Sequence, residues 1–288
     1  MVIPNFLIIG AAKSGTTSLY HYINKHPDIF MCPVKEPNYF NKHEVTNDKN
    51  QLSKAEYLDL FKGVEEEIAI GEASPTYICS EQAPKKIKTF NPDMRLIAIL
   101  RNPVERAFSN YLHSLRRVNK TMKTLDEIIM HDIAVLNEDK SQISQFVERG
   151  FYHEQLQNFY QEFDKSQIRV YLFEDLKDTP NILVKDIFRF LNVYDSFKIG
   201  TFKKYNKSGL ARIRWVGAFH NYLRKKDFYG LLKKFLSPEI LERLRDVVYT
   251  KNIELSDEAR DLLNALYYED ILKLEKLINR DLSHWLKI

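Results

Sequence analysis

The chain has few cysteines, no long apolar run and little net charge, and each of these absences excludes a class of protein. Two cysteines in 288 residues, Cys32 and Cys79, are too few for a zinc cluster or a disulfide framework, so we expect a reducing, cytoplasmic environment. No apolar stretch approaches the roughly 20 residues that a transmembrane segment needs. A net charge of +4 is too small to predict nucleic-acid binding, but it suits an enzyme whose ligand is a small polyanion.

Short apolar runs alternate with helical patterns through the first 200 residues. The apolar runs predict buried strands at Ile3–Ile9, Glu67–Gly71, Arg95–Leu100 and Ile168–Phe173. The helical patterns cover Thr16–His26, Ala83–Phe90, a segment opening at Pro103, and about Tyr152–Phe163. The first ten residues lack a basic start and lead into a glycine-containing turn, which favours a strand over a targeting segment. Strands separated by helices predict an α/β fold, in which helices flank a central parallel sheet in three layers.

The last third of the chain has a different character. No strand pattern follows residue 200, and Asp257–Leu286 is predicted to be a helix. The chain shows no internal repeat, low-complexity tract or proline-rich linker. We therefore expect a single domain over 1–288, with an α/β core at 1–200 and a mainly helical extension at 201–288.

The segment Gly10–Thr17 has the features of a phosphate-binding loop. A strand leads into a turn with Gly10 and Gly15, and the turn leads into a helix. Backbone N–H groups at a helix start attract an anion, and the helix dipole strengthens that attraction. Lys13 supplies a cation, and hydroxyl donors follow at Ser14, Thr16, Thr17 and Ser18. The alternative, a plain turn with a solvated lysine, explains fewer of these features.

The loop differs from the P-loop of nucleotide hydrolases at the position that matters most. That motif requires Lys and then Ser or Thr after its second glycine, whereas Thr16 and Thr17 stand there in this chain. The strand Arg95–Leu100 is followed by Arg101 rather than by a metal-binding aspartate. We therefore predict an anion site served by cations and amides, with no metal. A P-loop small-molecule kinase remains the main alternative.

Arg101 and Ser109 are candidates for a second phosphate site. Arg101 follows a predicted strand, and ligands of open α/β sheets bind outside the carboxyl ends of strands. Its planar guanidinium suits a phosphate, and Ser109 can add a hydroxyl from the following helix. A surface arginine and an ordinary helix serine are the alternative for these two residues taken alone.

Several motifs resemble those of sulfotransferases, which use 3′-phosphoadenosine 5′-phosphosulfate (PAPS) as donor. K-S-G-T-T-S-L resembles their 5′-phosphosulfate loop, and R-N-P-V-E-R-A-F-S-N-Y resembles their 3′-phosphate motif, with Arg101 and Ser109 at the matching positions. The segments H-P-D-I-F-M-C-P-V-K-E-P-N-Y-F and G-E-A-S-P-T-Y are similar to bacterial enzymes and to heparan sulfate glucosaminyl sulfotransferases. The resemblance covers most of the chain and implies a P-loop-like fold with PAPS as co-substrate and adenosine 3′,5′-bisphosphate (PAP) as product.

The chain departs from the heparan-type pattern at two places. Those enzymes usually carry a lysine where Ala73 stands here, and their late K-G-R loop over the donor is not present as such. Asn206–Arg212 resembles the bacterial version of that loop. The resemblance therefore implies further donor contacts from Lys207, Ser208, Gly209 and Arg212.

The resemblance also implies the catalytic residues. Glu36 stands where the heparan-type enzymes keep a catalytic glutamate, so we predict that it is the general base. We predict that Lys13 stabilises the leaving oxygen. The alternative for Glu36 is a surface carboxylate paired with Lys35. Glu72 is the second candidate base. His113 and His153 are kept as well, because the aryl and steroid sulfotransferases use a histidine.

The acceptor is not determined by these motifs. A saccharide, a glycolipid or another small alcohol is expected. The basic stretch Lys203–Lys234 is interpreted as a lid, an anionic-acceptor groove, a peripheral membrane contact or a solvated helix face. A catalytically silent, sulfotransferase-like binding protein is the non-enzymatic alternative, and the oligomeric state is left open.

Overall fold

The computed structural model describes residues 2–41, 52–117, 123–136, 142–200, 202, 210–211, 249–250 and 254–286. The chain divides into two compact units. The first, which we call the sheet unit, comprises Met1–Arg106, Arg149–Asn206 and Tyr267–Ile288. The second unit comprises Ala107–Glu148 and Lys207–Leu266.

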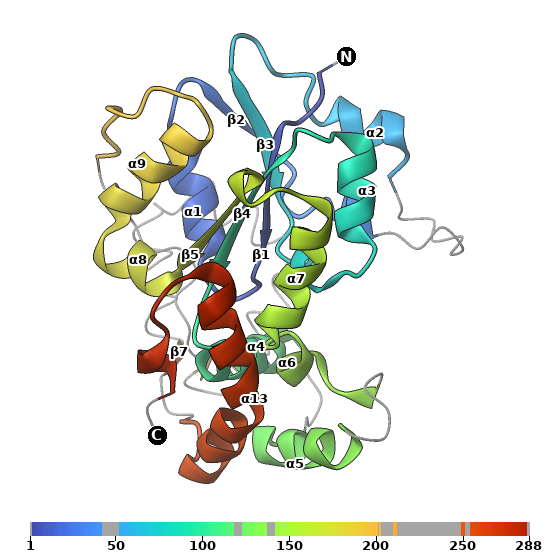
Figure 1. Cartoon of the computed structure of the whole chain (residues 1–288), viewed down its shortest axis with the longest axis vertical. Helices are drawn as coiled ribbons and strands as arrows, with labels where there is room; N and C mark the ends of the chain where they lie inside the picture. The colour runs from blue at the N-terminus through green and yellow to red at the C-terminus, as the bar shows by residue number, and fades with distance from the viewer. Residues whose placement is uncertain are drawn as a thin grey trace. The chain divides into compact units, whose positions relative to one another are not determined.

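The described part of the sheet unit contains one five-stranded parallel sheet, visible at the centre of Figure 1. Its strand order is β2-β3-β1-β4-β5. The strands are β1 (Phe6–Gly10), β2 (Ile29–Met31), β3 (Ala69–Ala73), β4 (Arg95–Leu100) and β5 (Ile168–Leu172). Every residue of β1 is buried, as expected for an apolar strand covered on both faces. Because the strands are parallel, their carboxyl ends meet at one edge of the sheet.

Helices cover both faces of this sheet. Figure 1 shows α1 (Thr16–Ile23), α8 (Phe173–Asp178) and α9 (Pro180–Phe190) on one side. On the other side lie α2 (Lys54–Asp59), α3 (Ala83–Phe90) and α7 (Tyr152–Glu162). Short 3₁₀ turns occur at Tyr39–Asn41, Tyr77–Cys79, Lys165–Gln167 and Ser283–Trp285. The result is the three-layer arrangement of a doubly wound α/β fold.

The second unit is described by fewer elements. It contains α5 (Leu125–Val135), α6 (Gln145–Glu148) and a two-stranded antiparallel pair, β6 (Leu210–Ala211) with β7 (Tyr249–Thr250). The boundary between the units falls within two helices, α4 (Pro103–Arg117) and α13 (Asp257–Ile278). Within the described residues, no helix is long and apolar enough to cross a membrane.

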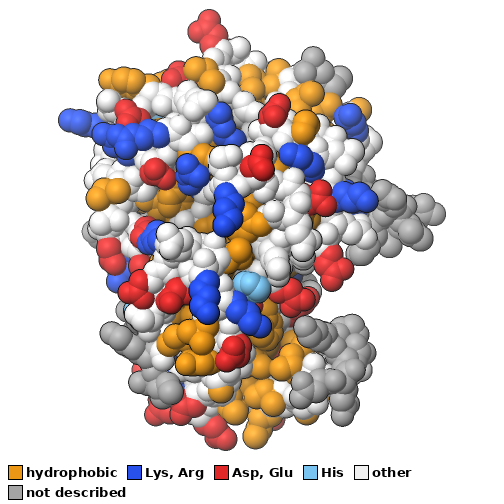
Figure 2. All heavy atoms as spheres, in the orientation of Figure 1, with side chains coloured by type: hydrophobic (Ala, Val, Ile, Leu, Met, Phe, Trp, Pro, Cys, Tyr) orange, Lys and Arg blue, Asp and Glu red, His pale blue; other side chains and the backbone are white. Residues whose placement is uncertain are grey.

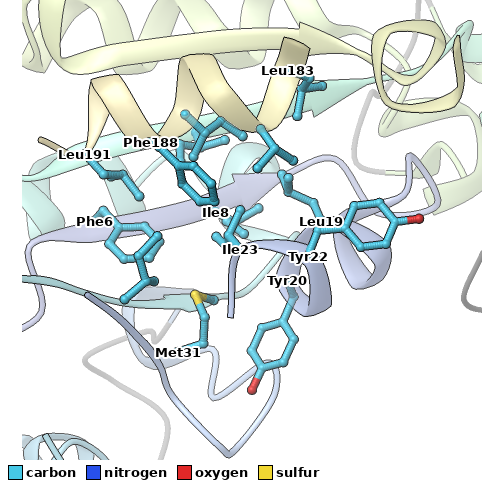
Figure 3. Packing of buried hydrophobic residues seen from close by; sticks show 14 of the residues in the cluster. Phe6, Ile8, Leu19, Tyr20, Tyr22, Ile23, Met31, Leu183, Phe188 and Leu191 are labelled. Carbon is cyan, nitrogen blue, oxygen red and sulfur yellow. The ribbon is translucent and has the colours of Figure 1, made fainter. Parts of the chain in front are cut away.

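An apolar cluster packs α1 and α9 against the sheet. Figure 3 shows Leu183 and Phe188 of α9, and Leu191 directly after it, facing residues of β1 and α1. Leu183, Val184, Ile187 and Phe188 recur at helical spacing, so they form one apolar face of α9, and all four are nearly inaccessible to solvent. Leu19 and Ile23 of α1 belong to the same cluster. This packing holds the start of α1 beside the end of β1, which positions the loop between them.

Charged side chains of both signs share the visible surface. Figure 2 shows lysines and arginines interspersed with aspartates and glutamates rather than gathered in one field. That mixture agrees with the small net charge of the sequence.

The predicted α/β fold class is confirmed, and the differences concern particular elements. α3 and β4 have the predicted bounds, whereas β1 begins three residues later than predicted, at Phe6. The prediction of no strand after residue 200 is wrong, because β6 and β7 pair there. The last helix ends at Ile278 rather than Leu286. The division into an α/β core at 1–200 and an extension stays a prediction.

Candidate active site

The loop between β1 and α1 has little room for a side chain at either of its glycines. Gly15 has a φ of 97°, in the left-handed region, and a Cβ there would lie 2.8 Å from Leu176 Cδ2. A Cβ on Gly10 would lie 2.5 Å from Ile78 Cγ2. Lys13 is also left-handed, with a φ of 73°. The turn is therefore tight, as the sequence predicts.

Hydrogen bonds attach this loop to the neighbouring strand. The Ala11 N–H donates to the Ile99 carbonyl of β4 at 2.8 Å, and the Ser14 N–H donates to the Ala11 carbonyl at 3.2 Å. These bonds fix the turn at the carboxyl edge of the sheet, directly before α1 begins at Thr16.

The start of α1 suits an anionic ligand. Gly15 stands at the N-cap and has no side chain with which to accept hydrogen bonds from the first turn. The Ser14 hydroxyl is buried and, among the described residues, makes no hydrogen bond of normal geometry. Thr16 and Ser18 are also buried beside it. First-turn amides and a buried hydroxyl are donors that a phosphate or sulfate group needs, so these residues fit the predicted phosphosulfate.

Arg101 lies next to this loop, as expected from its place after β4. Its guanidinium carbon is 5.1 Å from the centroid of the Phe173 ring, and the same ring would lie 3.2 Å from a Cβ on Gly15. The Tyr152 hydroxyl donates to the Arg101 carbonyl at 2.9 Å. Burial lowers the pKa of Arg101, yet a guanidinium remains charged at neutral pH. The guanidinium of Arg101 therefore lies close to the β1–α1 turn, where it also pairs with Glu105 of α4 at 3.4 Å.

Glu36 lies in the loop that follows β2, and this loop is attached to the end of β3. The Glu36 N–H donates to the Ala73 carbonyl at 3.2 Å, and the Asn38 N–H donates to Ser74 Oγ at 3.0 Å. Both Glu36 and Asn38 are left-handed, with φ values of 59° and 52°. The Glu36 side chain is 45% exposed, so its carboxylate is accessible to an acceptor.

Lys35 connects the Glu36 loop to the first turn of α1. Its Nζ donates to Thr17 Oγ1 at 2.6 Å and lies 3.0 Å from Glu36 Oε1. The ion pair of Glu36 with Lys35, the alternative reading of Glu36, is thus present. The same lysine also contacts the first turn of α1. Two motifs that are separate in the sequence meet through this lysine. Sequence reasoning treated Lys35 only as a surface partner, and no local pattern indicates its contact with Thr17.

Glu72, the second candidate base, is buried. It lies at the end of β3 and is 0% exposed, and Ser74 Oγ donates to its Oε2 at 2.9 Å. Burial raises the pKa of Glu72 to about 7, with the negative charge of Glu36 as a lesser cause. The Ser74 hydroxyl also accepts from the Asn38 N–H. Glu72 is therefore linked through Ser74 to the loop that carries Glu36. A fully buried carboxyl is poorly placed to meet an acceptor, so the geometry favours Glu36.

The other predicted residues lie on other elements, and their roles stay predictions. Ser109 is buried on α4 in the second unit, and His113 lies one turn further along the same helix. His153 lies in the first turn of α7, where its N–H donates to Asp270 Oδ2 at 3.1 Å, and burial lowers its pKa. Four predicted donor contacts lie outside the described residues: Lys207, Ser208, Gly209 and Arg212. Nearly all of Lys203–Lys234 lies outside them as well.

Comparison with known protein families matches residues 4–254 to the family described as "Sulfotransferase domain". The matched segment includes the β1–α1 loop, Glu36, Arg101 and Ser109. It therefore covers all the predicted donor residues and the predicted base.

Similar curated proteins are longer than this chain. The membrane-associated sulfotransferase kil1 of Dictyostelium discoideum is 36% identical over 116 residues, which is 40% of this chain and 24% of that protein. The bifunctional heparan sulfate N-deacetylase/N-sulfotransferase 4 of Mus musculus is 24% identical over 99% of this chain and 31% of its own length. The human heparan sulfate glucosamine 3-O-sulfotransferase 6 is 32% identical over 40% of this chain and 31% of its own length. The chain thus spans less than a third of these relatives.

A solved structure matches the whole chain. The crystal structure of a sulfotransferase from Alicyclobacillus acidocaldarius is 28% identical, with a TM-score of 0.73 and 100% coverage of both chains. The fold and the predicted family resemblance are therefore confirmed together.

Proposed function

The chain belongs to the sulfotransferase domain family, and on this premise we propose that it transfers a sulfuryl group from PAPS to a hydroxyl or amine of an acceptor. The observation that carries the proposal is the β1–α1 turn, which has uncapped helix amides, a buried serine hydroxyl and a lysine. The neighbouring Arg101 adds a cation at the same edge of the sheet. These groups suit a donor with two anionic ends.

The roles proposed for the donor site follow from charge and position. The amides of residues 14–18 and the Lys13 ammonium would hold the 5′-phosphosulfate at the start of α1. Arg101 and Ser109 would hold the 3′-phosphate, because they stand at the matching motif positions. The segment with Lys207, Ser208, Gly209 and Arg212 would close over the donor.

In the proposed chemistry, one group of residues acts on the acceptor and another on the leaving oxygen of the donor. Bound PAPS supplies the sulfuryl group, and PAP leaves with the electron pair of the broken S–O bond. Glu36 accepts the proton that the acceptor loses as its oxygen or nitrogen bonds to sulfur. Lys13 and the loop amides stabilise the charge that develops on the leaving oxygen. A positioned base contributes about 10²–10⁴-fold to such a rate.

A saccharide is the proposed acceptor class. The relatives named above include enzymes of heparan sulfate, and the human carbohydrate sulfotransferase 15 is 25% identical over 66% of this chain. The exposed carboxylate of Glu36 leaves room for a polar acceptor at the edge of the sheet. A cytoplasmic location and a peripheral membrane contact of residues 203–234 stay predictions.

The proposal is tested first by ligand binding. PAP, added without metal, is expected to raise the melting temperature, because a ligand at 100 times its dissociation constant stabilises by about 2.7 kcal/mol. ATP with Mg²⁺ serves as the comparison. Stabilisation by ATP–Mg²⁺ and none by PAP would favour the kinase alternative and refute the donor assignment.

Turnover is tested second, with sulfur-labelled PAPS and a panel of glucosamine-containing oligosaccharides and simple alcohols. Transfer of label to at least one saccharide is expected. PAP binding with no transfer to any member of the panel would instead favour the catalytically silent alternative.

A further inference from the structure

Lys35 occupies an unusual position among the lysines that pair with carboxylates in the described residues. Its ammonium lies between the hydroxyl of Thr17, at 2.6 Å, and the carboxylate of Glu36, at 3.0 Å. Thr17 belongs to the first turn of the helix that begins the anion-binding site, and Glu36 is the proposed base. One side chain therefore contacts both the proposed donor loop, through Thr17, and the proposed base, Glu36.

The Lys35–Glu36 pair is less exposed than the surface ion pair of Lys62 with Asp59. The Lys35 and Glu36 side chains are 32% and 45% exposed, whereas those of Lys62 and Asp59 are 75% and 63% exposed. The Lys62 ammonium donates to Asp59, the last residue of α2, only three residues earlier in the chain. Lys35, by contrast, has a second partner on another element, and that anchor fixes where its charge lies.

Hydrogen bonds to the end of β3 fix the backbone around Glu36. Rotation of the Glu36 side chain is the motion that these bonds leave open. The Glu36 N–H is bonded to the Ala73 carbonyl, and the next-but-one residue, Asn38, is bonded to Ser74. The side chain of Ala73 is a methyl group, so it cannot form an ion pair with the Glu36 carboxylate. The ammonium of Lys35 supplies the contact that orients the Glu36 carboxylate relative to α1.

We propose that Lys35 is a positioning residue that, anchored on Thr17, holds the carboxylate of Glu36 in place to accept the proton of the acceptor. This inference rests on the proposed function, since it assigns a role in the same reaction. It requires the contact to act on turnover rather than on donor binding, because Lys35 acts through Glu36. Misplacement of a reacting group by about 1 Å can lower a rate by about 10²-fold.

The experiment compares Lys35→Met, Lys35→Arg and the matched control Lys62→Met, which removes a similar ion pair far more exposed to solvent. For each variant kcat and KM are measured with labelled PAPS, and the dissociation constant of PAP by calorimetry. Lys35→Met is expected to lower kcat by about 10–100-fold and to leave PAP affinity within about threefold. Lys35→Arg should recover most of the rate because it keeps the cation. Lys62→Met should match the wild type.

A double-mutant cycle shows whether Lys35 acts through Glu36. If it does, the variant Lys35→Met with Glu36→Gln should be no slower than Glu36→Gln alone, because the partner is already lost. Melting temperatures of all variants confirm that each is folded.

Three results would overturn the inference. The first is a kcat of Lys35→Met within about twofold of wild type. The second is an additive loss in the double variant, which would mean that Lys35 acts independently of Glu36. The third is a large loss of PAP affinity, which would make Lys35 a donor-binding residue. A wild-type protein that neither binds PAP nor turns over PAPS would instead overturn the proposed function, and the inference with it.

Discussion

The buried carboxyl of Glu72 makes the most quantitative prediction, because its surroundings oppose ionisation. The side chain is 0% exposed, and its Oε2 accepts from Ser74, while the hydroxyls of Tyr57 and Tyr77 also face it. Burial raises its pKa from the ordinary 4.5 to about 7. We consider the substitution Glu72→Gln, which keeps the size of the side chain and an oxygen for Ser74 but does not titrate.

The sign follows from the protons that each state holds. Between pH 4.5 and about 7 the folded protein keeps a proton on Glu72 that the unfolded chain has lost, so the free energy of unfolding falls as pH rises. At about 1.4 kcal/mol for each pH unit, the gap between the two pKa values corresponds to about 3 kcal/mol. Glu72→Gln escapes this loss. The variant should therefore match the wild type near pH 4.5 and exceed it by up to about 3 kcal/mol above pH 7.

Urea unfolding at pH 5 and pH 8 measures this difference, and turnover at pH 7 is measured on the same samples. In a thermal melt at pH 8, the gain corresponds to about 5 °C for a chain of this size. Turnover should stay within about tenfold of wild type, because Glu36 rather than Glu72 is the proposed base. Equal pH dependence in both proteins would refute the raised pKa. A fall in turnover of 10²-fold or more would make Glu72 the base.

Three further substitutions test the donor loop and the base. Glu36→Gln should leave PAP affinity nearly intact and lower turnover by about 10²–10⁴-fold, and turnover within about tenfold of wild type would exclude Glu36 as the base. Lys13→Ala should weaken donor binding and turnover together, since one ammonium serves both, and unchanged steady-state kinetics would contradict its place in the site. Gly15→Ala should destabilise the protein by about 1–3 kcal/mol in urea unfolding, because a φ of 97° strains an L side chain and its Cβ would meet Leu176 Cδ2 at 2.8 Å. Gly63→Ala, whose Cβ would meet Phe30 at an ordinary 3.5 Å, is the control, and equal stability of the two variants would argue against the left-handed turn.

Much of the fold could be predicted because its signals are local. Arg95–Leu100 is a continuous apolar run that proved to be β4, and Ala83–Phe90 ends at an Asn-Pro pair that proved to end α3. The strand β2 was not predicted, because three residues, Ile29–Met31, are too few for a periodic pattern. The pair β6–β7 was missed for the same reason. Short strands are stabilised by their partners, and partners are not visible in a local window.

The candidate site divides in the same way. The glycines and Lys13 could be identified from the strand–turn–helix pattern, since the geometry of a helix start depends on neighbouring residues. Glu36 could be named only through the family resemblance, and its choice over Glu72 depends on burial. Burial is set by the elements that pack over a residue, here with Tyr57 and Tyr77 beside the carboxyl.

The parallel α/β architecture, the glycine-containing turn before α1 and the family could be read from the sequence, because periodicity and motif spacing are properties of contiguous residues. The contacts of Lys35 with Thr17 and Glu36, and the burial of Glu72 beside the Glu36 loop, depend on how the segments pack. The reason is the strand order, in which β3 lies between β2 and β1. That order brings the segments after these three strands to one edge of the sheet, and no pattern within any one segment records it.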